Sequence, residues 1–359
     1  MERQLTCYLR EELTSLTGVG LKIEILNPSR YAEWNNFVDS SPQGDVFCYS
    51  WWLDVITKSK FKIFVVIENN EIVAGIPAAY DVNNKINEPP LTRTLGVLYK
   101  LQANLTEHKQ SSYQRKWLSA LLGIIKPDNF VQMCTHHSFR DWLPFRWHGL
   151  KQTTRYTYII HYQNKTPDSL LEKLNRGKKS IIKIANKYGI KTEVSEDIEM
   201  LYYLVQQSYK RQGKKLGISL RDLINLDEAI KKNGNRLILN AIDCDDKVHA
   251  AIYLVFNKKS VYYLLSGCDS KYRDKGSQTL ILWEAVKYFC DKVQYFNFGG
   301  SDIKNIEEHV RCFGGELTPY FHIYNERNLH SNEIKYHLKE IVFHLKSLMK
   351  SVLYKLSIG

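Results

Sequence analysis

One stretch of this chain, residues 261–324, constrains the fold most, because strand-like and helix-like segments alternate along it. An aromatic, apolar run occupies residues 262–267, a polar turn follows, and residues 279–288 have helical spacing. A short run that ends in two glycines, a second short helix and a strand at residues 320–324 complete the stretch. This alternation is typical of α/β domains, in which ligands bind beyond the carboxyl ends of strands.

The first half of the chain has the same order of elements as the second. Residues 61–67 and 72–80 predict a β-hairpin, and residues 236–242 and 248–256 predict another. Helices precede each hairpin, and a strand, a helix and two further strands follow it. The repeat predicts two similarly built domains with a ligand cleft between them.

The domain boundaries follow from this repeat and from a change of pattern near the end of the chain. We expect an N-terminal domain at residues 1–163, a second domain at 164–326 and a C-terminal helix at 327–359. Apolar residues at helical spacing, interleaved with lysines between residues 334 and 356, make that helix basic and amphipathic. It could lie on an anionic membrane surface, but packing over the core of its own protein is the favoured interpretation.

Charge and cysteine usage narrow the class of protein. The chain has 359 residues, a formal net charge of +12 and seven scattered cysteines. Scattered thiols favour a reducing cytoplasm over a disulfide framework. We find no apolar run near the ~18 residues of a membrane span and no secretory signal at the start. The excess positive charge favours an anionic partner, such as a nucleotide, an RNA or a membrane face, but not DNA.

Five short motifs follow one another in the second half. They read Tyr-Lys-Arg-Gln-Gly at 209–213, Tyr-Tyr-Leu-Leu-Ser-Gly-Cys-Asp at 262–269, Leu-Ile-Leu-Trp-Glu-Ala-Val-Lys-Tyr at 280–288, Phe-Asn-Phe-Gly-Gly-Ser at 296–301 and Phe-Gly-Gly-Glu at 313–316. In order and spacing they resemble the Fem-type (FemABX-like) aminoacyltransferases and the related acetyltransferases of the GNAT superfamily. The resemblance covers about residues 21–324. Asn297 departs from it, because relatives often carry aspartate there.

This resemblance implies an α/β (α+β) fold of two tandem GNAT-like domains, each a mixed, mostly antiparallel sheet flanked by helices. It implies an N-acyltransferase of cell-envelope biosynthesis, with the acceptor side on the first domain and the acyltransferase on the second. The implied acceptor is an amine of a phosphorylated, nucleotide-linked or lipid-linked precursor, such as an amino sugar or a peptidoglycan-type peptide. Relatives use acyl-CoA or aminoacyl-tRNA as donor; we favour acyl-CoA slightly, and aminoacyl-tRNA remains open.

Acyl transfer to an amine needs a polarised carbonyl group and a group that accepts a proton. In this fold class the strand backbone around Leu265 and Ser266 would hold the carbonyl oxygen. Asp269 and Asp302 follow predicted strands, and Glu308 lies on the second short helix, so each is a candidate base. For any single one of these acids, capping a turn or a helix is the favoured interpretation.

The polar turn before residue 279 partly fits the phosphate-binding loop of acetyl-CoA-dependent acetyltransferases. A helix start with a nearby cation binds phosphate through backbone N–H groups. The candidate residues are Arg273, Lys275, Gly276 and Ser277, whereas Gln278 departs from the glycine or alanine expected there. A plain turn with Ser277 as the helix cap explains the same residues.

Basic and aromatic residues are the candidates for acceptor binding. Arg211, Lys214 and Lys215 follow a predicted helix, and the resemblance places a nucleotide or substrate phosphate near Arg211. Trp52 and Phe313 are the aromatic candidates. A solvated helix end explains the basic run equally well.

Two further patterns leave alternatives open. Lysines on the helix after residue 166 could bind tRNA, although a solvated helix face is the simpler explanation. No metal site is predicted, because Cys134, His136 and His137 are near neighbours in one strand, where successive side chains point to opposite faces. The competing function is a non-catalytic protein that binds RNA or a membrane surface.

Overall fold

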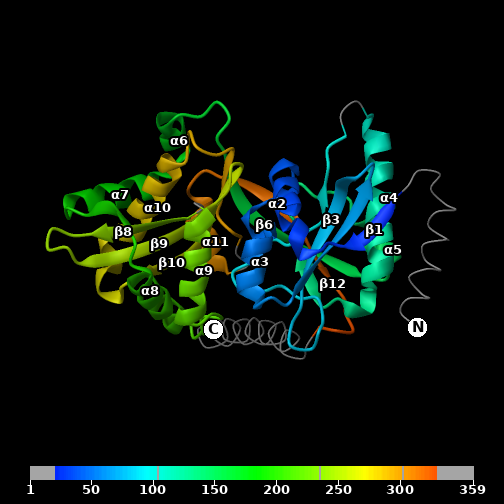
Figure 1. Ribbon diagram of the computed structural model, residues 1–359. Helices are drawn as coiled ribbons and strands as arrows, with labels where there is room; N and C mark the ends of the chain where they lie inside the picture. Colours follow the sequence, from blue (N-terminus) through cyan, green and yellow to red (C-terminus); the bar gives the residue numbers. More distant parts are fainter. Residues whose placement is uncertain (1–20, 103–104, 234–235, 301–302, 330–359) are drawn as a thin grey trace, which may run out of the picture.

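The computed structural model describes residues 21–329 except 103–104, 234–235 and 301–302 (Figure 1). The predicted amphipathic helix at 334–356 and the candidate base Asp302 therefore lie outside the described residues. No described helix has both the length and the apolar surface to cross a membrane.

The first half contains a four-stranded antiparallel sheet in the order β1-β2-β3-β4. Its predicted hairpin is confirmed, because β2 pairs with β3 along nearly its whole length. The elements of this half are β1 (Lys22–Ile25), η1 (Pro28–Arg30), α2 (Tyr31–Ser40), η2 (Val46–Cys48), α3 (Ser50–Thr57), β2 (Phe61–Glu68), β3 (Glu71–Ala79), β4 (Leu98–Tyr99), α4 (Glu107–Ile125), η3 (Pro127–Asn129), β5 (Gln132–Cys134), α5 (Leu143–Trp147) and β6 (Lys151–His161).

The second half repeats this order after two extra helices, and its predicted hairpin is the antiparallel pair β8 and β9. Its elements are α6 (Pro167–Lys173), α7 (Arg176–Lys187), β7 (Lys191–Ser195), α8 (Ile198–Arg211), α9 (Leu220–Asn233), β8 (Arg236–Ile242), β9 (Val248–Phe256), β10 (Ser260–Cys268), η4 (Ser270–Lys275), α10 (Ser277–Tyr288), β11 (Tyr295–Asn297), α11 (Lys304–Arg311) and β12 (Glu316–Tyr324).

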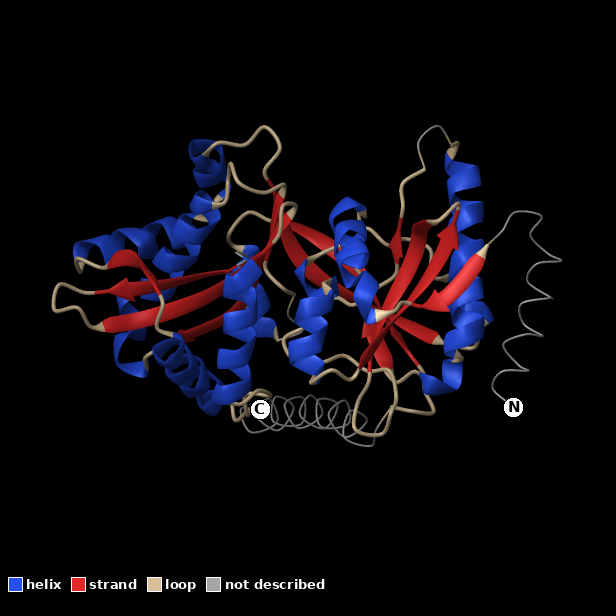
Figure 2. Cartoon of the chain, viewed as in Figure 1, coloured by secondary structure: helices blue, strands red, loops and turns tan. Residues whose placement is uncertain are grey.

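The last strand of each half lies beside strands of the other half. The large sheet has the order β5-β12-β6-β11-β10-β9-β8-β7. Strand β6 of the first half pairs with β11, and β12 of the second half pairs with β5. Strands β6 and β12 also pair with each other along nine residues. Figure 1 shows β12 among the elements of the first half, and Figure 2 shows helices flanking both sheets. The mixed, mostly antiparallel sheets confirm the expected fold class.

Two clusters of buried side chains fill the molecule. One includes Trp34 and Trp52 of the first half and continues through Leu204 and Leu226 on α8 and α9. The other lies on the opposite face of the large sheet, where α10 covers it and Phe296 is fully buried. Because the first cluster extends through both halves, apolar packing joins them directly.

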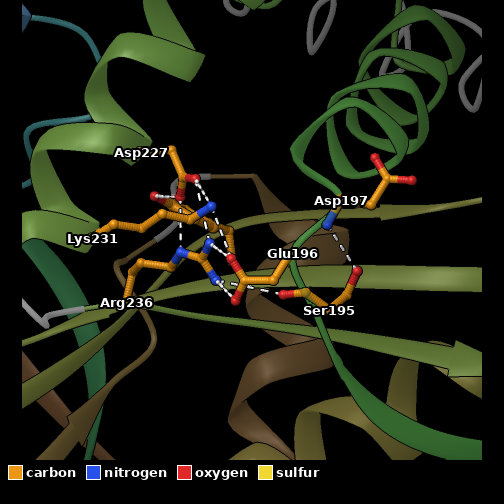
Figure 3. Close-up of polar contacts among 7 residues, drawn as sticks. Ser195, Glu196, Asp197, Asp227, Lys231 and Arg236 are labelled. Atoms are coloured by element: carbon orange, nitrogen blue, oxygen red, sulfur yellow. Dashed lines mark hydrogen bonds and ion pairs between the residues drawn. The ribbon is translucent and has the colours of Figure 1, made fainter.

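A cluster of charged side chains connects α9 to β8 (Figure 3). Arg236 Nε lies 3.0 Å from Asp227 Oδ1, although both side chains are almost fully buried. Asp227 also accepts a 2.8 Å hydrogen bond from the Tyr253 hydroxyl group. Glu196 joins the cluster from outside, and hydrogen bonds from Arg236 and Lys231 lower its pKa to about 2. These contacts stabilise the sheet end that lies away from β11.

Candidate functional site

Strands β10 and β11 separate shortly after they meet. Their parallel pairing ends at Tyr262 and Asn297, although β10 continues to Cys268. On its other side, β10 has one residue more than β9, because Tyr263 and Leu265 oppose consecutive residues of β9. The extra residue, Leu264, forms a β-bulge, a feature enriched next to active sites. We call the opening between β10 and residues 298–300 the wedge.

Asn297 fixes the opposite side of the wedge. Its side-chain oxygen accepts hydrogen bonds from the Thr157 hydroxyl group at 2.7 Å and from the Gly299 N–H group at 2.9 Å. Gly299 and Gly300 have φ angles of +80° and +71°, in the left-handed region that favours glycine. An aspartate at position 297 could accept both hydrogen bonds, so the departure from the resemblance preserves this turn.

The wedge opens into a cleft of about 630 Å³ that both halves line. The second half contributes the bulged part of β10, residues 298–300, the end of α8 and part of β12. The first half contributes the loop after β3, the end of β5 and the middle of β6. The polar lining residues are Glu88, Thr92, Arg93, Cys134, Thr153, Thr154, Arg155, Ser208, Tyr209, Gln212, Lys214, Tyr263, Ser266, Tyr320 and His322.

Cations outnumber acids in this lining. Arg93, Arg155 and Lys214 lie in the cleft wall, and Glu88 is the only carboxylate among the described lining residues. Arg155 Nη1 lies 3.9 Å from Glu88 Oε2, and it donates to Cys134 Sγ at 3.4 Å. The pKa of the Cys134 thiol is well above its usual value, first because of burial and second because of the nearby Glu88 carboxylate.

Three side chains in this wall are of the types that bind metals. Glu88, Cys134 and His322 place one potential ligand atom each within 4.8 Å of the others, and carboxylate, thiolate and imidazole suit zinc. Arg155 contacts both Glu88 and Cys134 and already supplies a positive charge there. His136, considered with Cys134 from the sequence, lies elsewhere and contacts Tyr295 and Ser138.

Arg93 extends from the first half into the wedge of the second. Its Nη2 donates a 2.9 Å hydrogen bond to the carbonyl oxygen of Leu264, the bulged residue. A Cβ at position 299 would lie 3.3 Å from Arg93 Nε and 3.0 Å from the Tyr263 carbonyl oxygen. Glycine at this position therefore allows the guanidinium group to lie between the two strand ends.

The candidate catalytic residues occupy different environments. Leu265 and Ser266 line the cleft at the wedge. Asp269 lies at the end of β10, where its side chain accepts a hydrogen bond from the Lys271 N–H group and caps η4. Glu308 is exposed on α11, 3.9 Å from Lys304 Nζ. Neither Asp269 nor Glu308 is part of the cleft lining.

The candidate phosphate loop packs against helix α7. Gly276 has a φ angle of +77°, and a Cβ there would lie 2.7 Å from the Ile181 carbonyl oxygen. Ser277 is buried and its hydroxyl group contacts His249 Nδ1 at 3.1 Å. Lys275 lies over the Tyr188 ring at 3.8 Å, and Arg273 is exposed. None of the four loop candidates, which are all described residues, lines the cleft.

The candidate substrate residues also separate into two groups. Lys214 lines the cleft, whereas Lys215 is exposed outside it. Arg211 donates hydrogen bonds to the Cys268 carbonyl oxygen at 2.9 Å and to Ser208 Oγ at 2.8 Å, and so connects α8 to the end of β10.

The two aromatic candidates are core residues. Trp52 is fully buried, and its indole N–H group donates to the hydroxyl group of the lining residue Thr92. Phe313 is buried against the ring of the lining residue Phe298. Each therefore supports a wall of the cleft from behind.

Sequence reasoning missed Glu88, Arg93 and Arg155 as site residues. Glu88 and Arg93 flank two prolines in a loop without a recognisable motif. Arg155 is the only charged residue between positions 152 and 160 of a strand. A charge in the middle of a strand was the one available signal, since such a residue is seldom buried without a partner.

Comparison with known proteins places this geometry in a class. Residues 172–309 match the family described as acetyltransferase (GNAT) domain, whereas no curated protein has a significantly similar sequence. The solved structure of FemX has a TM-score of 0.63 with this chain at 14% identity, over 88% of this chain and 99% of FemX. L-PGS from Bacillus licheniformis has a TM-score of 0.49 at 12% identity, over 84% of this chain and 93% of its own.

The second half therefore carries a GNAT acetyltransferase domain, and the protein is an acyltransferase by class. The chain as a whole has the Fem-type GNAT fold, because the similarity to FemX extends over both halves.

Proposed function

We propose that this protein is an N-acyltransferase that moves an acyl group, preferably from acyl-CoA, to an amine of a phosphorylated cell-envelope precursor. Amino sugars and peptidoglycan-type peptides are the acceptor classes we favour. The observation that carries the proposal is the wedge at Leu264, which opens into a cleft lined by both halves. Such an arrangement brings a carbonyl group held by one half to an amine held by the other.

The reaction follows from the groups in the cleft. The acyl carbonyl group lies along the β10 edge at Leu265 and Ser266, where backbone N–H groups polarise it. The amine nitrogen attacks the carbonyl carbon, the new C–N bond forms, and the bond to the leaving sulfur of CoA breaks. Glu88, the carboxylate of the described lining, accepts the proton that the amine loses. Asp302, outside the described residues, stays the second candidate for this role.

The charge of the cleft supports an anionic acceptor. Arg155 and Lys214 line it, and an arginine binds a phosphate through two parallel hydrogen bonds. The reaction belongs in the cytoplasm under this proposal, because CoA and tRNA donors are made there. A peripheral membrane contact through residues 334–356 is a separate part of the prediction and concerns residues that the structure does not describe.

Aminoacyl-tRNA is the alternative donor, and one observation favours it. Lys183 and Lys187 are exposed on α7, and Lys173 and Arg176 are exposed just before them. Arg176, Lys183 and Lys187 are spaced seven and four residues apart, which places them on one face of α7. Cations on one face suit the phosphate backbone of an RNA. Replacing Lys183 and Lys187 with glutamine should weaken tRNA binding and flatten its salt dependence, as a filter-binding titration would measure.

An acyl-transfer assay tests the proposal. Purified protein is incubated with acetyl-CoA and a panel of UDP-linked amino sugars and peptidoglycan-type peptides, and free CoA thiol is measured. Glu88→Gln should lower kcat/KM by about 10²–10⁴-fold, the usual contribution of a positioned base. Glu172→Gln, on the exposed face of α6, is the matched control. Failure of the wild-type protein to transfer any acyl group, from acetyl-CoA or from aminoacyl-tRNA, would refute the proposed function.

A further inference from the structure

Arg93 brings a positive charge from the first half to the strand edge where the acyl carbonyl group is proposed to lie. Its guanidinium group is fixed on one side by the 2.9 Å hydrogen bond to the Leu264 carbonyl oxygen. On the other side, Nε lies against the backbone of Gly299, where a Cβ would come within 3.3 Å. The group is therefore positioned by both edges of the wedge.

The Nε–H group of Arg93 lacks a hydrogen-bond acceptor among the described residues, and it is buried. Buried polar groups in folded proteins are almost always hydrogen-bonded, and a charged donor left without a partner is costly. Because Arg93 lines the cleft beside Leu264 and Leu265, a shift of its guanidinium group toward a bound substrate atom would give Nε the acceptor that it lacks.

We propose that Arg93 is a catalytic residue, whose guanidinium group stabilises the negative charge that develops on the acyl carbonyl oxygen. This inference rests on the proposed function. As the amine nitrogen attacks, the π electrons of the C=O bond move to oxygen, and the positive charge of Arg93 lies beside it. When the tetrahedral intermediate collapses, the C=O bond re-forms and the donor's leaving group departs with its bonding electrons. The amine's proton leaves through Glu88 or water.

In this proposal each half contributes one part of the site that binds the carbonyl oxygen. The β10 backbone alone offers N–H dipoles, whereas Arg93 adds a full positive charge, held at the wedge by its hydrogen bond to the Leu264 carbonyl oxygen. Preorganised charge of this kind acts on the transition state more than on the bound substrate. Loss of Arg93 should therefore lower kcat and leave the KM values for donor and acceptor nearly unchanged.

The test compares Arg93→Met, Arg93→Lys and Arg93→Ala with wild type, using acetyl-CoA and the acceptor that wild type acylates best. We expect kcat to fall by about 10²–10³-fold in Arg93→Met, the loss found when one oxyanion donor is removed. Added guanidinium chloride should partly restore kcat in Arg93→Ala. Arg146→Met, an exposed arginine on α5, should keep wild-type kinetics. Melting temperatures show whether each variant is folded. If Arg93→Met or Arg93→Ala unfolds the protein, Arg93→Lys, which keeps a positive charge at this position, is compared with wild type instead.

The outcomes separate this inference from the proposed function. If wild type transfers acyl groups and the folded Arg93 variants keep kcat, the assignment of Arg93 is wrong and the proposed function stands. An increase in KM for donor or acceptor at unchanged kcat would make Arg93 a ground-state anchor for an anionic group, which also overturns the assignment. Absence of acyl transfer by wild type would refute both the proposed function and the assignment of Arg93.

Discussion

Asp45 should make the stability of this protein depend on pH in a way that one substitution removes. Its carboxylate is fully buried between the halves, where it accepts hydrogen bonds from the Phe47 N–H group at 3.0 Å and the Tyr262 hydroxyl group at 3.2 Å. The Thr94 hydroxyl group donates a third hydrogen bond. Burial outweighs these donors and the nearby Lys259, and raises the pKa of Asp45 from 3.8 to about 6.

The sign of the effect follows from proton binding. Between pH 3.8 and about 6 the folded protein holds a proton on Asp45 that the unfolded chain has released. Stability contributed by this group is therefore present at low pH and is lost as pH rises through that window. At about 1.4 kcal/mol per unit of pKa shift, the loss between pH 4 and pH 7 is roughly 2–3 kcal/mol.

Asp45→Asn should remove this component, because asparagine fills the same space without titrating. We expect the stability of the variant relative to wild type to increase by roughly 2–3 kcal/mol between pH 4 and pH 7. Urea unfolding followed by tryptophan fluorescence at a series of pH values measures this difference. Asp168→Asn, at the exposed start of α6, controls for the loss of one charge. A relative stability that stays constant from pH 4 to pH 7 would refute the reasoning.

Three further changes test packing and charge pairing in the fold. A Cβ at position 267 would lie 2.2 Å from the Leu204 carbonyl carbon, so Gly267→Ala should cost about 3 kcal/mol or more in urea unfolding. Gly123→Ala, inside α4 with no atom within 4 Å of the new Cβ, should instead stabilise the protein by about 1 kcal/mol. If Gly267→Ala and Gly123→Ala change the free energy of unfolding equally, the argument from close contacts at Gly267 is wrong. Asp227→Asn removes the buried carboxylate from Arg236, which keeps Glu196, and should cost about 1–3 kcal/mol, whereas an unchanged unfolding midpoint would show that the buried pair contributes little.

The local parts of this structure could be predicted from sequence, whereas contacts between distant segments could not. The run at residues 262–267 and the glycines at 299 and 300 predicted the two strand ends, because apolar periodicity and glycine placement are local signals. The contact between Arg93 and Leu264 joins residues 171 positions apart. No spacing rule connects an arginine in one loop to a carbonyl oxygen in a distant strand.

Two other features show the same limit. The pattern that predicted β6 gave no information about its neighbours, because a strand has the same alternation in either sheet. The residues at 273–277 fitted a phosphate loop as far as residue types can show. Their packing against α7 depends on where residues 176–187 fold, which the loop sequence does not encode.

The placement of β6 and β12 has a consequence for how this protein can be divided. Cleavage of the chain near residue 163, followed by separation of the two pieces, would part β6 from β11 and β12 and would part β5 from β12. The unpaired strand edges left on both pieces would be prone to pair with other chains. Neither piece should be recoverable as a stable monomer, although together the two fragments could reassemble. Loops away from the cleft can vary in sequence, but neither half can be lost without removing strands that pair with the other half.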